Sequence, residues 1–372
     1  MEFRLATFNV ENLFVRLDFN AFTDERAQNY LPAVAQFYAQ DAAADGDLSR
    51  FEAFKAMLSG VMLAQADDKR QFTAAAMAEA DAHLFCMQEV DNINALMRFH
   101  DAYLKKAGAG AYAQKILFEG NDRRGIDVAA LARDERAVMS RSHAWLTPSW
   151  FGNQAARDAL IEAYPLIKSE INKRRAIFSR DCLEMEYAHD GKRLTVFNCH
   201  FKSMSGGRNK SLGKRQLEAL AVKRIIQNKF ADPAAENWVV VGDMNDYRQQ
   251  IKVTAKRRAD GSYVENLKTL GADDPSGVDP LLDDGFGVNA LDALDATARW
   301  THYYPGDRTK TQLDYMIVSP ALNARIKGKP QVIRSGQPYR VPNSDEIQRY
   351  PRIGMDRPKA SDHCPVAVTF KL

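Results

Sequence analysis

The sequence predicts an α/β protein in which mixed or antiparallel sheets are covered by helices. Three observations lead to this prediction: apolar strand-like runs outnumber helical ones, several runs follow one another without an intervening helix, and most end in polar residues. A doubly wound parallel sheet would need a helix between successive strands. The chain has 372 residues, of which 45% are hydrophobic, so it can bury a large core.

The elements follow in order along the chain. Alternating or continuous apolar patterns predict strands over 3–14, 82–90, 125–133, 180–188, 192–203, 237–246, 312–320 and 363–372. Helical spacing predicts helices over 69–80 and 212–230, and a helical insertion or lid at about 16–67. Segments 250–285 and 325–358 are rich in Gly, Pro and charge, which predicts long surface loops. Without an internal repeat, one domain spanning 1–372 is expected.

Composition limits the class of protein. The 51 Lys and Arg residues against 48 Asp and Glu residues give a net charge of +3, so any affinity for a polyanion must come from a local patch. The four cysteines form no CxxC pair, and three of them lie in apolar or site-adjacent runs, where small buried side chains in a reducing compartment are expected. The N-terminus lacks the apolar core of a secretory signal, and no run reaches the roughly 18 apolar residues of a membrane span. We therefore expect a cytoplasmic protein without stable membrane association; the sequence identifies no protein partner.

Side chains suited to metal binding or proton transfer lie at the ends of the predicted strands. Apolar runs end in, or start from, side chains suited to metal binding or proton transfer: Asn9 and Asn12, Glu89, His200 and Lys202, Asp243 and Asn245, Asp314, and Asp362 and His363. Each alone also fits an ordinary turn, because Asn, Asp and Gly supply turn chemistry. Strand ends of one sheet system gather at one edge, however, so these side chains are expected to share a cleft.

The residue types indicate a hard metal ion. Mg²⁺ prefers oxygen ligands and is usually held by one or two carboxylates together with a substrate phosphate. Glu89, assisted by Asn9 and Asp362, is the predicted metal site, and Mn²⁺ is a possible substitute for Mg²⁺. The sequence shows no His and Cys cluster for a closed zinc site, which disfavours Zn²⁺.

Two histidines are suited to phosphoester chemistry. The imidazoles of His200 and His363 titrate in the range needed to move protons or, when charged, to stabilise a phosphorane-like transition state. A carboxylate bonded to one ring nitrogen would fix the tautomer, and Asp314 is the predicted partner of His363.

Six ordered motifs carry a family resemblance: "TFNVEN", "MQEV", "NCHFKS", "VGDMND", "LDYMIVS" and "SDHCPV". Over residues 3–370 the chain resembles the endonuclease/exonuclease/phosphatase superfamily, which includes DNase I-like nucleases. The resemblance implies a four-layer α/β/β/α sandwich with two mixed sheets and a Mg²⁺ site at one sheet edge.

The resemblance also implies roles for the residues at these positions. Asn9 and Glu89 match the metal-site residues, Asp243 and Asn245 match the catalytic "GDxN" pair, and Asp314 matches the carboxylate that orients His363. His200 matches a catalytic histidine and Asp362 a metal-site residue. The segment "NDRRGIDVA" resembles a strand that presents an arginine, so Arg124, with Asn12 and Lys202, is expected to contact the substrate phosphate.

The expected activity is Mg²⁺-dependent hydrolysis of DNA or RNA phosphodiester bonds by in-line attack of water. The run "HFKS" departs from the Tyr and Asn of apurinic endonucleases, which argues against abasic-site repair as the main role. Basic runs at 168–175 and 202–215 favour nucleic acid, although each also fits a solvated loop. The alternative is a phosphatase or phospholipase C-like hydrolase of an inositol phosphate or lipid headgroup. The complete motif set opposes a non-catalytic binding module, and His302 is expected to be structural or loop-borne.

Overall fold

The computed structural model describes residues 2–13, 67–122, 124–133, 137–189, 191–271, 273–342 and 346–372. The helical insertion predicted at 16–67 therefore falls outside the described residues, except for residue 67. Residues 67–80 are helical, as predicted for 69–80.

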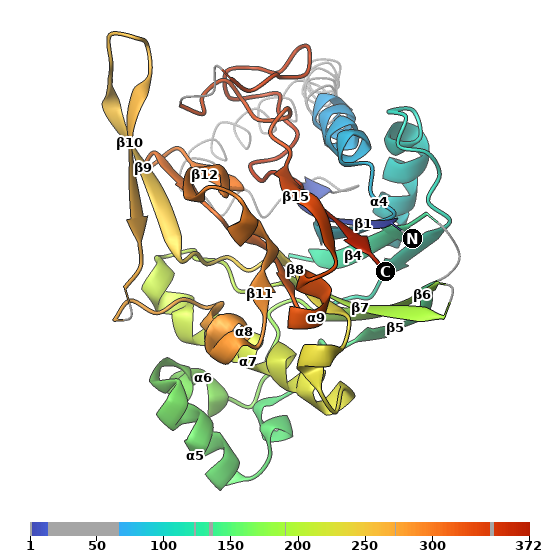
Figure 1. Ribbon diagram of the computed structural model, residues 1–372, viewed down its shortest axis with the longest axis vertical. Coiled ribbons are helices and arrows are strands. Elements are labelled where there is room, and N and C mark those ends of the chain that lie inside the picture. Colours follow the sequence, from blue (N-terminus) through green and yellow to red (C-terminus); the bar gives the residue numbers. More distant parts are fainter. Residues whose placement is uncertain are drawn as a thin grey trace, which may run out of the picture.

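The first large sheet has six strands in the order β15-β16-β1-β2-β4-β3. They are β1 (Glu2–Leu13), β2 (Leu84–Val90), β3 (Gln114–Leu117), β4 (Asp127–Ala132), β15 (Ile326–Val332) and β16 (Val366–Lys371). Strand β1 runs parallel to β2 and antiparallel to β16. The last strand thus lies beside the first, and the two chain ends are neighbours (Figure 1).

The second large sheet also has six strands, in the order β11-β14-β8-β7-β6-β5. They are β5 (Ala137–Ser142), β6 (Cys182–His189), β7 (Lys192–His200), β8 (Trp238–Asp243), β11 (Val288–Asn289) and β14 (Asp314–Val318). Strands β7 and β8 are parallel, whereas β14 is antiparallel to β8. The eight strands predicted from the sequence are thereby confirmed, and both sheets are mixed.

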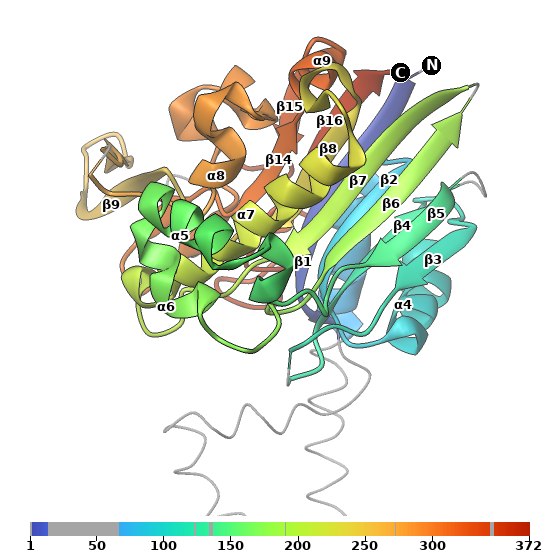
Figure 2. The same cartoon turned by 90° about the horizontal axis from the view of Figure 1, so that it is seen from below.

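The two sheets pack face to face with helices on their outer faces. Side chains such as Leu5, Val196 and Met316 fill the layer between the sheets, and fully burying each contributes about 1.5–3 kcal/mol. Helix α7 (Leu212–Lys229) covers the second sheet, and residues 67–80 with α4 (Ile93–Phe99) cover the first (Figures 1 and 2). This arrangement is the predicted four-layer α/β/β/α sandwich.

A buried polar contact joins the two sheets. The amide of Asn198, on β7, donates to the carbonyls of Met87 at 3.2 Å and Ala129 at 2.9 Å. The Asn198 Oδ1 atom accepts from Gln88 at 2.7 Å. Because a buried polar group that lacks partners is destabilising, these bonds fix the register of one sheet against the other.

A smaller four-stranded sheet corrects the loop predicted at 250–285. Its order is β10-β9-β13-β12, with β9 (Gln249–Arg257), β10 (Tyr263–Thr269), β12 (His302–Tyr304) and β13 (Thr309–Thr311). The side chains of β10 are largely exposed, so this strand lacks the buried face that hydrophobic periodicity detects. The loop predicted at 325–358 is wrong in the same way over β15, an edge strand with exposed lysines.

Short helical elements complete the described chain. They are α5 (Gln154–Ala163), α6 (Lys168–Ile171), α8 (Asp279–Leu282), α9 (Pro320–Asn323), η2 (His100–Leu104), η3 (Pro148–Phe151), η4 (Pro165–Ile167), η5 (Arg208–Ser211), η6 (Pro233–Ala235), η7 (Asp283–Gly285), η8 (Ala290–Ala293) and η9 (Ala296–Ala298).

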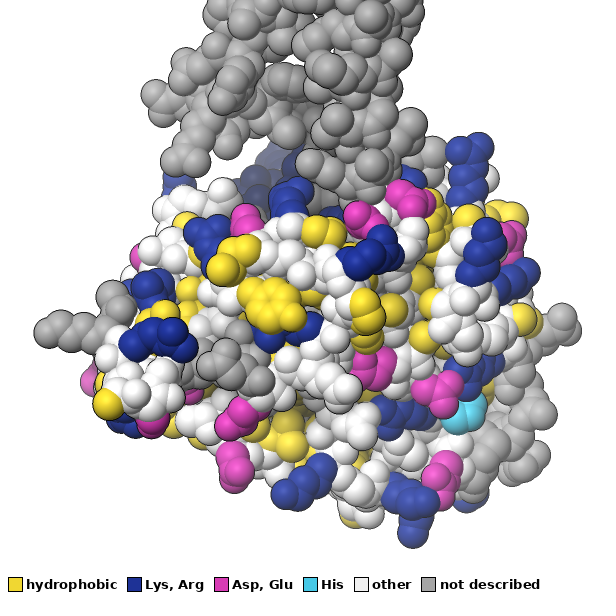
Figure 3. Space-filling view, turned by 90° about the horizontal axis from the view of Figure 1, so that it is seen from above, with side chains coloured by type: hydrophobic (Ala, Val, Ile, Leu, Met, Phe, Trp, Pro, Cys, Tyr) yellow, Lys and Arg dark blue, Asp and Glu magenta, His cyan; other side chains and the backbone are white. Residues whose placement is uncertain are grey.

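The surface and the cysteines agree with the composition. On the face in Figure 3, Lys and Arg side chains are interspersed with Asp and Glu. All four cysteines are buried and free, including the one that lies outside the apolar and site-adjacent runs. Within the described ranges, none of the helices has the length and apolar character needed to cross a membrane.

Candidate active site

Strand register brings three of the predicted side chains together. His200 is the last residue of β7 and Asp243 the last of β8, and these two residues pair across the parallel strands. Asp314 begins β14 and pairs with Asp243 from the antiparallel side. Residues paired across neighbouring strands project to the same face of a sheet, so His200, Asp243 and Asp314 stand in one row.

Asp243 lies at the centre of a hydrogen-bond network. Its Oδ2 atom accepts from Asn9 Nδ2 at 3.0 Å and from Asn245 Nδ2 at 2.9 Å, and its Oδ1 atom accepts from the Asn245 amide at 2.8 Å. His200 Nε2 is 3.4 Å from Oδ2. Burial by itself raises the pKa of Asp243, but His363, His200 and the Asn245 amide more than offset it and hold that pKa below its ordinary value. The Asp243 carboxylate is therefore ionised at neutral pH.

His363 and Asp314 form a buried pair. His363 Nδ1 is 2.8 Å from Asp314 Oδ2, whereas Nε2 faces Asp243 Oδ2 at 3.9 Å. Burial alone would lower the pKa of His363, but the carboxylates of Asp314, Asp243 and Asp362 raise it well above its ordinary value. The Thr301 hydroxyl accepts from the Asp314 amide at 3.0 Å and so holds the start of β14.

Ser361 connects the first and last motifs. Its hydroxyl donates to the Asn9 carbonyl at 2.7 Å and accepts from the His363 amide at 3.1 Å. The "SDH" segment, which precedes β16, is thereby fixed against the end of β1. The sequence assigned no role to this serine.

Glu89 is presented by a β-bulge. Gln88 pairs with Val128 and Val90 pairs with Asp127, so Glu89 is an extra residue on β2 with φ of +66°. Bulges of this kind re-aim side chains next to active sites. The Glu89 side chain is 17% exposed, its Oε2 accepts from the Asn12 amide at 3.0 Å, and its Oε1 is 4.0 Å from His200 Nε2.

The end of β1 is irregular beside Glu89. Glu11 and Asn12 have φ of +49° and +62°, a left-handed conformation that L residues adopt uncommonly. The Glu11 amide donates to Asn9 Oδ1 at 3.0 Å. The Glu11 side chain lies between two lysines, with Lys359 Nζ at 3.2 Å and Lys69 Nζ at 3.5 Å from its carboxylate oxygens. The negative charges of Asp362 and Glu89 also act on the Lys69 ammonium and favour its charged form.

The donor set at this end of the cleft suits a hard divalent cation. The oxygens available here are the carboxylates of Glu89 and Asp362 and the amide oxygen of Asn9, which also accepts from the Glu11 amide at 3.0 Å. The Glu89 carboxylate is partly exposed, and its Oε1 lies beyond hydrogen-bond distance of His200. Carboxylate and amide oxygens are the ligands that Mg²⁺ and Mn²⁺ take in proteins.

The three predicted phosphate-binding residues have different surroundings. Asn12 is exposed beside Glu89, and Lys202 has an exposed side chain while its amide donates to Glu218 at 2.8 Å. Arg124 is 48% exposed and paired with Asp122 through contacts of 3.2 Å.

Arg180 and His302 both contact residues of the site, and sequence reasoning assigned neither of them a role there. The buried Arg180 lies 2.9 Å from Asp122 and donates to the Phe201 carbonyl at 2.8 Å, directly after His200. His302, expected to be structural or loop-borne, pairs in register with His363, and the two ring centroids are 4.8 Å apart. Burial, with His363 nearby, lowers the pKa of His302 to about 4 against the opposing effect of Asp362. Neither residue follows a strand in a recognised motif, so spacing gave no signal for them.

The basic run at 202–215 is only partly available to a ligand. Arg208 and Arg215 both contact Asp246, at 2.6 Å and 2.9 Å, and Asp246 is fully buried. Lys202 and Lys210 are exposed. A hollow of about 440 Å³ beside this run is lined by residues that include Lys210, Tyr247 and Lys268.

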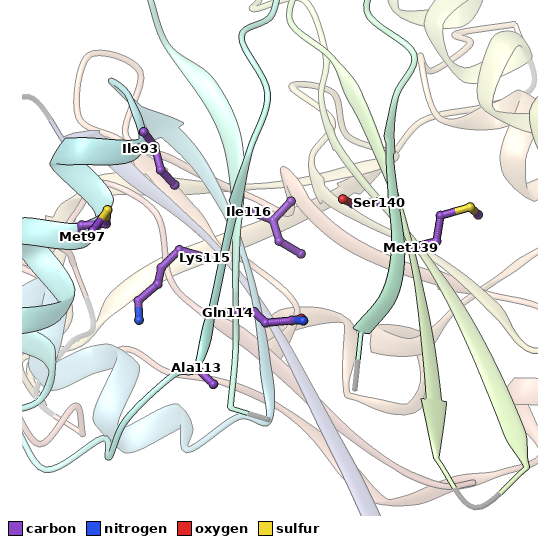
Figure 4. A pocket seen from close by; sticks show the side chains of 8 residues that line it. All are labelled: Ile93, Met97, Ala113, Gln114, Lys115, Ile116, Met139 and Ser140. Atoms are coloured by element: carbon purple, nitrogen blue, oxygen red, sulfur yellow. The ribbon is translucent and has the colours of Figure 1, made fainter. Parts of the chain in front are cut away.

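A second hollow, of about 480 Å³, lies between the edge strands β3 and β5 (Figure 4). Ile93 and Met97 of α4, Ile116 of β3 and Met139 of β5 contribute to its lining. None of the cleft residues lines it, and the lining is mostly neutral, so it offers no phosphoester chemistry.

Comparison with known proteins agrees with the fold and the motifs. Residues 4–327 match the model of the Endonuclease/Exonuclease/phosphatase family. The chain belongs to this family, and it has the DNase I-like fold of these phosphoric ester hydrolases. No curated protein sequence matches the chain.

Solved structures resemble the whole chain at low sequence identity. Truncated Caenorhabditis elegans TDP2 is 13% identical, with 100% of this chain and 98% of that chain covered and a TM-score of 0.51. SmcL is 15% identical, with 100% and 99% covered and a TM-score of 0.51. A humanized D. rerio TDP2 is 15% identical, with 100% and 99% covered and a TM-score of 0.50. These likenesses show the fold alone.

Proposed function

We propose that this protein is a Mg²⁺-dependent phosphodiesterase that hydrolyses DNA or RNA. The observation that supports this best is the meeting, at one edge of the sandwich, of an ionised Asp243, two histidines and the open carboxylate of Glu89. Such a cleft has groups for the nucleophile, for the charge on the phosphate and for a divalent cation.

Glu89, Asn9 and Asp362 are proposed to hold the metal. When bound, Mg²⁺ neutralises charge on the phosphate oxygens and stabilises the leaving oxygen. Mn²⁺ offers the same geometry and is expected to substitute.

Asp243 is proposed to orient the attacking water and accept its hydrogen bond. The carboxylate is held in place by Asn9 and Asn245, so it needs no reorganisation during the reaction. Asn245 Nδ2 also donates to the Phe201 carbonyl at 3.1 Å, so binding of a non-bridging phosphate oxygen by Asn245 would replace one of its two present acceptors. This assigns the nucleophile side of the reaction to β8.

His363 and His200 are proposed to stabilise the negative charge that develops in the transition state. Asp314 holds Nδ1 of His363, so Nε2 is the ring nitrogen directed at the reacting phosphate. The raised pKa of His363 favours the charged imidazole, which can also protonate the leaving oxygen.

A nucleic-acid substrate is supported by the basic hollow next to β8. Lys202 and Lys210 are exposed, and Lys268 lines the same hollow as Lys210 and Tyr247. Tyr247 lies two residues after Asn245, so this hollow adjoins the "GDMN" segment, and we assign its lysines to phosphates that flank the cleaved bond. Asn12 and Arg124 are proposed to contact the phosphate from the first sheet.

A substrate panel tests the proposal. Plasmid, single-stranded DNA, RNA, inositol phosphates and sphingomyelin are incubated with Mg²⁺, Mn²⁺ or EDTA, and cleavage is followed by electrophoresis and phosphate release. The proposal expects cleavage of a polynucleotide that stops with EDTA and weakens as salt rises. Exclusive release of phosphate from monoesters, or full activity in EDTA, would overturn it.

A further inference from the structure

Three side chains in the cleft form a second donor set that contains nitrogen. His302 begins β12, and its backbone pairs with His363 in an isolated antiparallel bridge. The same contact is extended by the Cys364 amide, which donates to the Thr301 carbonyl at 2.7 Å. Asp362 precedes His363, so one carboxylate and two imidazoles lie together although His302 and Asp362 are distant in the sequence.

The distances fit a single small ion. His302 Nε2 is 3.9 Å from Asp362 Oδ2, and His363 Nε2 is 4.0 Å from Asp362 Oδ1. One ligand atom from each of the three residues lies within 4.8 Å of the others. Two ligands at the usual Zn²⁺ distances are ~3.4 Å apart in a tetrahedron and up to ~4.2 Å apart across the ion. The Asp362 side chain is 38% exposed, so its carboxylate has room to turn, and the two imidazoles must approach the ion with it.

The orientation of His363 also favours a metal ligand. Its Nδ1 is bonded to Asp314 Oδ2 at 2.8 Å, which leaves Nε2 directed into the cleft. A carboxylate behind the ligating histidine is the usual support of a metal-bound imidazole, because it fixes the ring and raises its basicity. The ring of His302 packs against that of His363, which restricts both donors.

We propose that His302, Asp362 and His363 bind a borderline transition-metal ion, of the Zn²⁺ or Co²⁺ type, at a position separate from the oxygen donors of Asn9 and Glu89. Two imidazoles and one carboxylate are a ligand set of Zn²⁺, Co²⁺ and Fe²⁺ sites, whereas Mg²⁺ keeps to oxygen. The sequence shows no such cluster, because β12 and the "SDH" segment meet only in the folded chain.

One consequence rests on the proposed function. An ion at this position takes the place of the proton on His363 Nε2, and that proton leaves to solvent. The same ion also binds Asp362, which we propose as a ligand of Mg²⁺ too. Zn²⁺ at this site is therefore expected to inhibit the Mg²⁺-supported hydrolysis.

Cobalt provides a readout that is independent of activity. The full-length protein is freed of metal with EDTA, returned to chelator-free buffer and titrated with Co²⁺, whose visible ligand-field bands report nitrogen coordination. We expect one Co²⁺ with imidazole ligation, displaced by Zn²⁺ and left in place by excess Mg²⁺. His302→Gln and His302→Phe should each weaken Co²⁺ binding by about 10-fold or more, and the Phe variant keeps a ring against His363.

A matched control is His143, which directly follows β5. His143 also contacts a carboxylate, with Nε2 at 2.7 Å from Glu184 Oε2, but lies outside this donor set. His143→Gln should therefore leave the Co²⁺ spectrum and affinity unchanged.

The outcomes separate this inference from the proposed function. Co²⁺ binding that is equal in wild type and both folded His302 variants, or a spectrum with oxygen ligands alone, would overturn the proposed site. A protein that binds Co²⁺ through His302 but cleaves no phosphodiester would keep the site and reject the proposed function. Zn²⁺ inhibition that persists unchanged in His302→Phe would reject the inhibitory role.

Discussion

The cleft has two halves that are built differently. The half from the second sheet consists of buried side chains, since Asp243 and Asp314 are at most 1% exposed and their carboxylates are hydrogen-bonded. The half from the first sheet is mixed: Asn9 and His363 are 1% and 6% exposed, whereas the Glu89 and Asp362 side chains are 17% and 38% exposed. Left-handed backbone occurs on this side at Glu11, Asn12 and Glu89, and after β8 at Asn245; Asn tolerates this conformation, but Glu11 and Glu89 are not of a favoured type.

The difference shows which half depends on a ligand. Buried hydrogen bonds fix Asp243, Asp314 and His363 whether or not substrate is present, because an unpaired buried charge would be strongly unfavourable. A left-handed conformation at a residue other than Gly costs about 1–2 kcal/mol, and Glu89 carries this strain at a half-open position. We infer that the buried side chains Asp243, Asp314 and His363 supply preorganised chemistry, and that the more exposed carboxylates of the first-sheet half are completed by a cation.

Asp243→Asn should produce the largest effect, because it removes the charge at the centre of the buried half and keeps the shape. We expect kcat to fall by about 10³-fold, with the fold retained, in an assay with bis-p-nitrophenyl phosphate. Asp292→Asn is the control, since Asp292 is 54% exposed and outside the cleft. A rate within threefold (about 0.6 kcal/mol) of wild type would contradict the role of Asp243.

Glu89→Gln tests the open half. The amide can still accept from the Asn12 N–H, but the negative charge that attracts a cation is lost. The Mg²⁺ concentration for half-maximal activity should rise by about 10- to 100-fold, as measured by titrating EDTA-treated enzyme with Mg²⁺. Glu162→Gln, an exposed position on α5, should leave the titration unchanged. An unaltered Mg²⁺ dependence in Glu89→Gln would remove this residue from the metal site.

Asp127 tests the support behind the Glu89 bulge through stability. Burial raises the pKa of Asp127 to about 6, and nearby Glu119, Asp181 and Asp122 act in the same direction against the Gly120 N–H bond. The folded pKa is above the unfolded value of about 3.9, so the ionised group destabilises the fold above pH 6, by at most about 3 kcal/mol. This penalty is relieved as pH falls from about 6 to about 4.

Asp127→Asn should therefore raise the free energy of unfolding at pH 8 by about 1–3 kcal/mol. The difference between variant and wild type should shrink toward pH 4, where wild-type Asp127 is protonated when folded. Urea denaturation at several pH values measures this difference. A gap that is constant with pH would show that ionisation of Asp127 does not limit stability.

Glu11→Gln tests whether the lysine pair helps to shape the open half. The carboxylate lies between Lys69 and Lys359, and the Glu11 amide holds Asn9 Oδ1. Loss of the charge should lower activity by about 10-fold, through a less fixed Asn9, with little change in melting temperature. Glu11→Gly relieves the left-handed strain but also loses the carboxylate, so the two variants should lose similar activity. Wild-type rates in both would show that the lysine pair is dispensable.

Strands with buried faces and residues in local motifs were more predictable than exposed strands and long-range contacts. Strands with a continuous apolar run, such as β2 and β8, were predicted from sequence because both faces are buried, and their polar ends marked Glu89 and Asp243. Strand β10 was missed because its side chains face solvent and its pattern resembles a loop. The resemblance of the motifs to the family predicted the four-layer α/β/β/α arrangement, which hydrophobic periodicity alone did not.

Long-range pairings account for the residues that were missed. His302 enters the cleft only through its bridge to His363, and Arg180 only through contacts with Asp122 and the Phe201 carbonyl. Neither contact leaves a local pattern, because the partners are far apart in the chain. The left-handed φ at Glu89 is likewise invisible in the sequence, since Glu is not a residue type that favours it.

Arg124→Ala should change the kinetics least. It tests whether Arg124 only binds the substrate phosphate through an exposed ion pair or also takes part in the chemistry. Arg124 is 48% exposed and already contacts Asp122 at 3.2 Å, so its contact with a substrate phosphate is exposed to solvent and competes with that pair. Exposed ion pairs are worth about 0–1 kcal/mol, which corresponds to at most about a fivefold rise in KM at unchanged kcat. Steady-state kinetics on a short DNA duplex at low and high salt measures this. A fall in kcat of about 100-fold, with the fold intact, would instead place the Arg124 guanidinium on the transition state and make the open half a direct contributor to the chemistry.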